Sequence, residues 1–205
     1  MNNKAIYKLS YGLYVLTARC GGKDNGCIIN TALQAASAPN QLSICVNKAV
    51  HTHDMIKKTG VFTVSVLSEA ADFSMFQHFG MQSGRDVNKF ADFRACRRGE
   101  NGLYYITKGT NAYISVGVDR TMDLGSHTLF VGEITDMEVL NDIPSMTYDF
   151  YQEKVKPKSK EVQKAEGEMT IWRCHNCGYE YEGETVPEDF TCPICNHPAS
   201  DFERN

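Results

Sequence analysis

The chain has 205 residues, of which 42% are hydrophobic and 22% charged, with a formal net charge of −4. This composition is typical of globular proteins, and the length accommodates one medium domain and one small domain. No run of about 18 apolar residues is present, so no transmembrane helix is expected. The N-terminal residues lack a signal-peptide pattern, and we expect a cytoplasmic protein whose eight cysteines stay reduced.

Residues 1–150 alternate short apolar segments with turns, a pattern typical of β-structure. Segment 61–67 alternates at period two and is the clearest predicted strand. Short helices are predicted over 51–58, capped by Thr52, and over 70–79, where phenylalanines recur every three residues. The remaining predicted strands are residues 14–18, 27–30, 42–46, 104–107, 112–119 and 128–139, and the polar residues 80–100 form a predicted loop-rich insertion.

Closely spaced strands without a βαβ rhythm favour a β-barrel over a parallel sheet. No G-x-G-x-x-G motif follows a strand, so a Rossmann dinucleotide fold is not supported. The sequence thus predicts a mainly β domain over 1–151, a charged linker over 152–168 and a small domain over 169–205. The linker has five lysines, four glutamates and no aromatic residue. As a flexible coil it would span about 20–25 Å.

Four cysteines of the small domain form two Cys-x-x-Cys pairs, Cys174 with Cys177 and Cys192 with Cys195. Each pair lets two thiolates converge at a tight turn, and two pairs make a tetrahedral sulfur site suited to zinc or iron. Neither pair is followed by histidine, so covalent haem attachment is excluded. Residues 169–205 carry a net charge of −5, which disfavours a nucleic-acid-binding zinc ribbon with a basic face.

The aromatic residues around these cysteines extend the motif to W-x-C-x-x-C-G-Y-x-Y followed by C-P-x-C. This pattern resembles a rubredoxin, and the 14 residues between the pairs resemble the shortened type found in rubrerythrins. The resemblance implies a single iron, held by the four cysteines, that carries one electron at a time. A structural zinc site is the alternative.

Residues 26–67, continuing to Phe90 and resuming at 125–133, resemble the flavin reductase-like family. The resemblance implies a split β-barrel that binds FMN. Small polar groups where a strand meets a loop can hydrogen-bond the edge of the flavin ring, although they can also simply cap a turn. A helix N-terminus beside a lysine suits a phosphate. The candidate ring residues are Asn30, Thr31, Gln34 and Ser37, and the candidate phosphate residues are Asn47, Lys48, Thr52 and Lys89.

His127 matches the histidine of the family's Gly-Asp-His segment, which lies near the flavin where nicotinamide arrives. Here Ser126 replaces the aspartate. The resemblance implies a catalytic role for His127, whereas a lone histidine at a strand start is commonly an ordinary surface or core residue. The cysteines outside the two pairs lack ligand spacing, and we expect most of them to pack as small apolar groups.

The combined architecture resembles the high-molecular-weight rubredoxins of anaerobic bacteria. It implies that NADH or NADPH reduces FMN, that the iron collects electrons singly, and that an acceptor redox protein receives them. The implied acceptor is a flavodiiron protein that reduces oxygen or nitric oxide, and the implied assembly is a homodimer. Neither a nucleic acid nor a membrane is expected as a partner. One alternative is a flavin reductase that releases reduced FMN and carries a zinc ribbon; another is a redox sensor.

Overall fold

The computed structural model describes residues 5, 8–157, 170–174, 179–192 and 198–204. The chain divides into two compact units, Met1–Val155 and Lys156–Asn205, which are described separately. The predicted linker lies mostly outside the described residues. Within those residues, no helix has the length and apolarity needed to cross a membrane.

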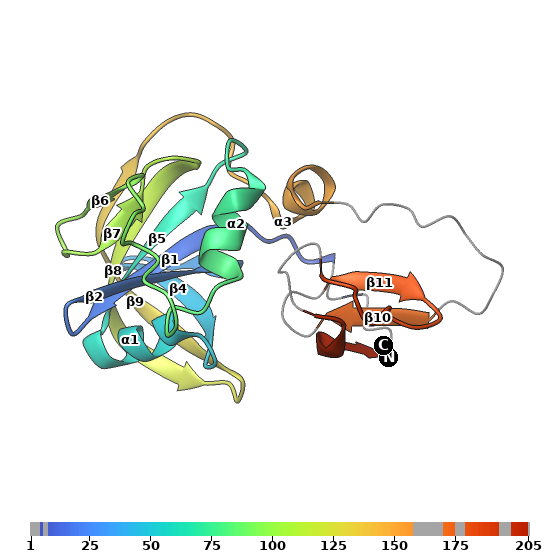
Figure 1. The fold of residues 1–205 in the computed structure, drawn as a ribbon. Coiled ribbons are helices and arrows are strands. Elements are labelled where there is room, and N and C mark those ends of the chain that lie inside the picture. Colours follow the sequence, from blue (N-terminus) through green and yellow to red (C-terminus); the bar gives the residue numbers. More distant parts are fainter. Residues whose placement is uncertain (1–4, 6–7, 158–169, 175–178, 193–197, 205) are drawn as a thin grey trace. The chain divides into compact units, whose positions relative to one another are not determined.

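The first unit is built on a seven-stranded antiparallel sheet with the order β2-β1-β5-β8-β9-β4-β3 (Figure 1). The long β8–β9 hairpin pairs with β5 on one side and β4 on the other, so β2 and β3 form the sheet edges. The sheet strands are β1 (Tyr14–Cys20), β2 (Lys23–Ile29), β3 (Ala32–Ser37), β4 (Asn40–Asn47), β5 (Val61–Leu67), β8 (Thr110–Asp123) and β9 (His127–Val139); β6 (Cys96–Arg98) and β7 (Tyr104–Ile106) form a separate ribbon.

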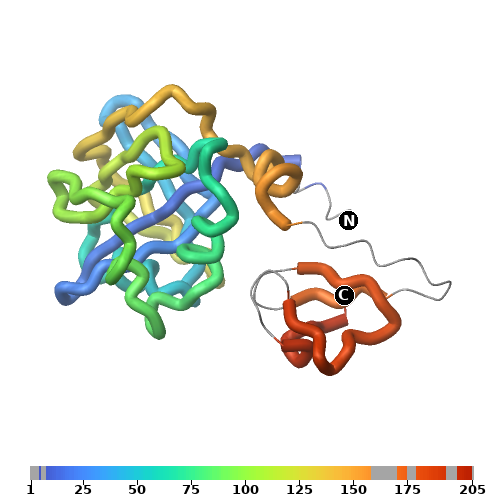
Figure 2. The backbone as a smooth tube through the Cα atoms, turned by 45° about the horizontal axis from the view of Figure 1, so that its top comes forward, coloured from blue at the N-terminus to red at the C-terminus, as the bar shows by residue number. Residues whose placement is uncertain are grey.

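Two helices pack against this sheet, each in its own hydrophobic cluster, and Figure 2 shows the backbone of the unit from a second direction. Helix α1 (His51–Thr59) buries Met55 and Ile56 against the side chains of the central strands. Helix α2 (Phe73–Gly80) buries Phe76 and Phe79 in a second cluster, where the Phe76 ring lies 4.2 Å from that of Tyr151. Burial of each such apolar side chain contributes roughly 1.5–3 kcal/mol to the free energy of folding. Tyr151 is the first residue of the short helix η2 (Tyr151–Val155), which follows the short helix α3 (Tyr148–Phe150) at the end of the unit.

The predicted mainly β fold, an FMN-type split barrel, is confirmed, and strand 61–67 is β5 to the residue. The α1 helix also forms as predicted and ends at Gly60, whose φ of 70° suits a C-cap. Its predicted N-cap is wrong, because Val50 occupies that position and Thr52 lies inside the first turn. Helix α2 begins later than predicted, because the Asp72 carboxylate accepts a hydrogen bond from the backbone N–H of Ser74 and caps the helix there.

The second unit contains a three-stranded antiparallel sheet with the order β11-β10-β12. Its core is aromatic: the Phe190 ring lies 4.7 Å from that of Tyr181 and 5.5 Å from that of Phe202. The Trp172 indole donates to the carbonyl of Gly183 at 3.1 Å and fixes one end of the sheet. The elements of this unit are β10 (Thr170–Cys174), β11 (Glu180–Gly183), η3 (Ala199–Asp201) and β12 (Phe202–Arg204).

Candidate functional site

A cavity of about 410 Å³ opens beside β3, in the size range of small-molecule sites. The strand-end turn at Asn30 and Thr31 forms one wall, β4 forms another, and the segment that leads into β1 closes it. The lining residues are Ser10, Tyr11, Gly12, Tyr14, Asn30, Thr31, Ala32, Leu33, Ser43, Ile44, Cys45 and Leu129.

Hydrogen bonds between its walls hold this cavity open. The Thr31 hydroxyl donates to the Cys45 carbonyl at 2.9 Å, and the Cys45 N–H donates to the Thr31 carbonyl at 3.3 Å. The Tyr14 hydroxyl reaches the Ala32 carbonyl at 3.4 Å, and partial burial raises the pKa of that phenol. The Asn30 amide, in contrast, makes no side-chain hydrogen bond with any described residue, so it can serve a ligand.

The four predicted ring residues therefore divide into two groups. Asn30 and Thr31 line the cavity. Gln34 and Ser37 are exposed on β3 and do not line it, and the Gln34 amide donates to the Asn40 side chain at 2.9 Å. A bulge between Gln34 and Ala36 shifts the pleat of β3 at this point.

The predicted phosphate residues Asn47 and Lys48 end β4 and lead into α1. The Asn47 side chain accepts from the Ala49 N–H at 2.8 Å and shapes the turn 47–50. Lys48 forms an ion pair with Asp123 at 2.6 Å. Because Val50 provides no side-chain cap, the backbone N–H groups of His51 and Thr52 are open to another acceptor, whereas the His53 N–H donates to the Val50 carbonyl at 3.1 Å.

Thr52 and Lys89, also predicted at the phosphate, point into the protein. Thr52 is fully buried and accepts from the Asn25 amide at 3.0 Å. Lys89 is 4% exposed, and its ammonium donates to the carbonyls of Gly26 and Phe79 at 2.9 Å each. Burial lowers the pKa of Lys89 to about 8. Thr52 thus ties α1 to β2, and Lys89 ties the loop that follows α2 to both β2 and α2.

The candidate catalytic residue His127 starts β9 directly opposite Asn47 of β4. Its Nδ1 lies 2.9 Å from the Ser126 hydroxyl, and the backbone carbonyl of Ser126 accepts from the Lys48 N–H at 3.0 Å. The β4–β9 register therefore brings His127 together with the predicted phosphate turn. No local pattern in the sequence reveals this pairing.

Cys45 is the lining residue that sequence reasoning missed most clearly. Its strand position predicts a packed apolar side chain, whereas it is half-buried in the cavity wall, where burial raises the pKa of its thiol. The alternation along β4 was available as a signal, because Leu42, Ile44 and Val46 are buried and the residues between them are less so.

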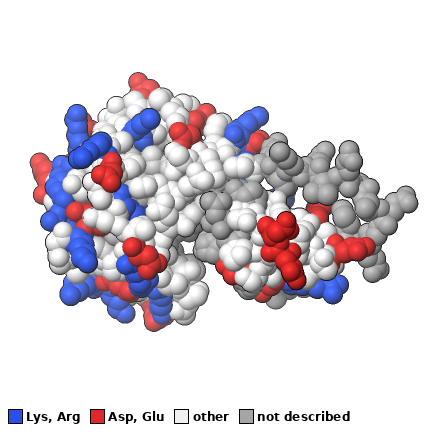
Figure 3. Space-filling model, in the orientation of Figure 1, with Lys and Arg blue, Asp and Glu red and all other residues white. Residues whose placement is uncertain are grey.

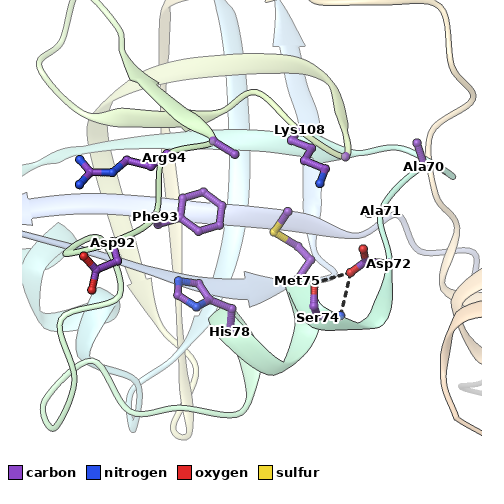
Figure 4. A pocket seen from close by; sticks show the side chains of 12 residues that line it. Ala70, Ala71, Asp72, Ser74, Met75, His78, Asp92, Phe93, Arg94 and Lys108 are labelled. Atoms are coloured by element: carbon purple, nitrogen blue, oxygen red, sulfur yellow. Dashed lines mark hydrogen bonds between the residues drawn. The ribbon is translucent and has the colours of Figure 1, made fainter.

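A second cavity, of about 450 Å³, lies beside α2 and shares no lining residue with the first (Figure 4). Met75 and Phe93 form its floor, and the Lys108 side chain projects into it from above. His78 is fixed at its edge, because Nε2 donates to the Lys89 carbonyl at 2.7 Å. No predicted site residue lines this cavity.

Two of the four predicted metal ligands lie among the described residues. Cys174 is 1% exposed and pairs with Phe202 of β12, and Cys192 is fully buried, an environment that suits thiolates bound to a metal. The backbone N–H of Cys174 donates to the carbonyl of Tyr179 at 2.8 Å. Cys177 and Cys195 lie outside the described residues.

Two family descriptions match the chain. Residues 6–159 match the flavin reductase like domain, and residues 172–203 match the rubrerythrin, rubredoxin-like domain. The chain therefore belongs to the flavin reductase-like family and carries a rubredoxin-like domain that follows the barrel domain in the sequence. These two domains make it an oxidoreductase for electron transfer, and they support flavin and iron as its cofactors.

Among named proteins, the chain is 33% identical to the high molecular weight rubredoxin of Moorella thermoacetica, over the full length of both chains. The predicted resemblance to that group is confirmed. The chain is also 38% identical to a ferric-chelate reductase (NAD(P)H) of Archaeoglobus fulgidus, over 78% of this chain and 94% of that one. The solved NADH:FAD oxidoreductase of Streptomyces globisporus covers 70% of this chain and 84% of its own with a TM-score of 0.63; its 24% identity shows the fold alone.

Proposed function

We propose that this protein takes hydride from NADH or NADPH with FMN bound in the barrel, and passes electrons singly to an iron held by its four cysteines. A partner redox protein, which we propose to be a flavodiiron protein, then receives them. The observation that carries this proposal is the cavity lined by Asn30 and Thr31 in a chain that also carries a rubredoxin-like domain. Bound FMN supplies two-electron uptake and single-electron release, and the iron supplies single-electron transfer.

The ring end of the flavin would lie in the cavity beside β3. There the Asn30 amide is available to hydrogen-bond the ring edge, whereas the Thr31 hydroxyl holds the Cys45 carbonyl and fixes the wall. None of the lining side chains is charged, which suits an uncharged ring. Gln34 and Ser37, on the exposed part of β3, would contact only a ligand that extends beyond the cavity.

The phosphate end would lie at the turn 47–50. The uncapped N-terminus of α1 offers N–H groups and a favourable dipole, and Lys48 offers a positive charge. Lys48 would exchange its partner Asp123, which is exposed, for the phosphate. Thr52 and Lys89 would act indirectly, Thr52 by tying α1 to β2 and Lys89 by tying β2 to α2. His127, facing Asn47, is the residue that we propose meets the incoming nicotinamide.

The rubredoxin-like unit would deliver the electrons. Its described acidic side chains are mostly exposed, and Figure 3 shows several on its surface. A partner with a basic docking face would be steered to this unit by charge, as is usual for brief electron-transfer encounters. The exposed acidic residues are Glu180, Glu182, Glu184, Glu188, Asp189 and Glu203.

We also propose a homodimer in which a second copy covers β3. This strand is a sheet edge beside the cavity, and Leu33 on it is 70% exposed. An exposed apolar edge strand is commonly covered by a partner. The second copy would then shield the flavin from solvent.

An anaerobic titration of the full chain with NADH tests the proposal, with the metal content measured first. We expect one iron and one FMN per chain, bleaching of the flavin band, and then bleaching of the red ferric tetrathiolate bands. Zinc in place of iron, with free reduced FMN as the product, would support the alternative of a flavin reductase with a zinc ribbon. Reoxidation of the reduced protein by an added flavodiiron protein tests the proposed acceptor.

A further inference from the structure

A chain of side-chain contacts links the loop after α2 to the start of β9. Arg85 in that loop donates to the Asp54 carboxylate at 2.7 Å. The other carboxylate oxygen of Asp54 accepts from His53 Nδ1 at 3.0 Å, and His53 Nε2 lies 2.9 Å from the Thr128 hydroxyl. Thr128 immediately follows His127. The contacts therefore join three elements that lie far apart in the sequence.

Arg85 also holds the turn 47–50 directly. Its second terminal nitrogen donates to the Ala49 carbonyl at 2.7 Å. On the opposite side, the Lys48 N–H donates to the Ser126 carbonyl at 3.0 Å, and inside the turn Asn47 accepts from the Ala49 N–H. The turn is thus fixed from both sides, and Arg85 is the only described side chain from the loop 81–90 that hydrogen-bonds to it.

The inner members of this series of hydrogen-bonded side chains, His53 and Thr128, are buried and have a fixed geometry. His53 is 4% exposed and Thr128 is 5% exposed, and the Phe130 ring packs edge-on against His53 at 5.6 Å. The hydrogen bond from His53 and the nearby Arg85 lower the pKa of Asp54, so its carboxylate stays charged at neutral pH. A buried imidazole bonded through both nitrogens cannot rotate without losing both contacts. The first turn of α1 is therefore locked to β9.

We propose that Arg85, acting through Asp54, His53 and the Ala49 carbonyl, is a positioning residue for the phosphate end of the flavin site. In this structure each of its terminal nitrogens donates to a protein partner, so the role that we assign to it is to hold the turn and α1 and not to contact the phosphate. By fixing them, it keeps the open N–H groups and Lys48 aimed at one point, which preorganises the site. This inference rests on the proposed binding of FMN at the turn 47–50.

The test compares the dissociation constants of FMN and riboflavin, which differ only in the phosphate, for the full chain and its Arg85→Gln variant. We expect the variant to bind FMN about tenfold more weakly, in line with the effect of losing other orienting contacts, and riboflavin unchanged. Arg85→Lys, which keeps one cationic donor, should restore part of the loss. Thr128→Val removes the hydrogen bond to His53 at the other end of this series of contacts with little change in shape. It should shift the ratio of the dissociation constants for FMN and riboflavin in the same direction as Arg85→Gln.

Arg98→Gln is the matched control, because Arg98 also joins a carboxylate, that of Asp24, to a backbone carbonyl, that of Gly102. The ratio of its dissociation constants for FMN and riboflavin should equal that of the unmodified chain. An unchanged ratio in Arg85→Gln and Thr128→Val, or an equal shift in Arg98→Gln, would overturn the inference. Equal affinity of the unmodified chain for FMN and riboflavin would instead show that the proposed phosphate site itself is wrong.

Discussion

The burial of the Lys89 ammonium leads to a prediction about the pH dependence of stability that does not depend on any ligand. Only 4% of this residue is exposed, its ammonium bonds to two backbone carbonyls, and none of the ion pairs among the described residues includes it. Burial lowers the pKa of Lys89 from 10.5 to about 8. Because the charged form is disfavoured inside the fold, Lys89 should make the folded state less stable below pH 8 than at higher pH.

The size of this effect follows from the pKa shift. Between pH 8 and 10.5 the unfolded chain binds more protons at Lys89 than the folded chain does, so the free energy of unfolding rises with pH in that window. At 1.36 kcal/mol for each pKa unit, the full rise is about 3 kcal/mol, of which about 1 kcal/mol is reached by pH 9.

Urea denaturation of the unmodified chain and of Lys89→Met at pH 7, 8 and 9, followed by far-UV circular dichroism, measures this rise. Subtracting the two free energies removes the contribution of groups that titrate alike in both proteins. The difference, unmodified chain minus variant, should rise by about 1 kcal/mol from pH 7 to pH 9. A flat or falling difference would refute the reasoning, and the exposed Lys108→Met should give a flat one.

Saturating FMN extends the same experiment to the predicted contact between Lys89 and the phosphate. A phosphate beside the ammonium would keep it charged and abolish the rise of stability between pH 7 and pH 9. Persistence of the rise would mean that Lys89 keeps its two carbonyl partners when FMN binds.

Three further predictions concern single contacts. Asp123→Asn should strengthen FMN binding roughly two- to fivefold at low salt, because it releases Lys48, and the gain in a fluorescence titration should vanish near 1 M salt. Leu33→Glu should dissociate the proposed homodimer, which sedimentation velocity would detect; an unchanged sedimentation coefficient would move the interface away from β3. Cys177→Ser should leave NADH-dependent flavin reduction nearly intact and abolish delivery to the partner, and loss of both would mean that the two steps are not separable.

Features that depend on nearby residues could be predicted from the sequence. Strand β5 is one, because its period-two alternation directly reflects one buried and one less buried face. The rubredoxin-like domain is another, because its cysteines and aromatic residues form a local motif, and a family description matches residues 172–203. The helix α1 was predictable for the same reason, together with its end at Gly60.

Side-chain direction could not be predicted, because it depends on long-range packing. Gln34 and Ser37 sit on opposite sides of a β-bulge, which changes the face that a strand residue points to. The residues around Thr52 predict that it is the N-cap of the helix, yet Thr52 lies on the buried face of α1 and hydrogen-bonds to Asn25. Lys89 reads as a surface cation, yet its partner Gly26 lies 63 positions away.

The charge distribution along β4 gives the proposed site a direction. The cavity at Ile44 and Cys45 has no charged lining residue, whereas Lys48 and the N-terminus of α1 place positive charge just beyond the strand end. Lys48 follows Cys45 by three positions, which corresponds to about 10 Å of extended chain. A flavin bound the other way round would place its phosphate among uncharged groups, at a cost of several kcal/mol for an unpaired anion. The polarity of this one strand would therefore orient the proposed FMN, with the ring beside β3 and the phosphate at α1.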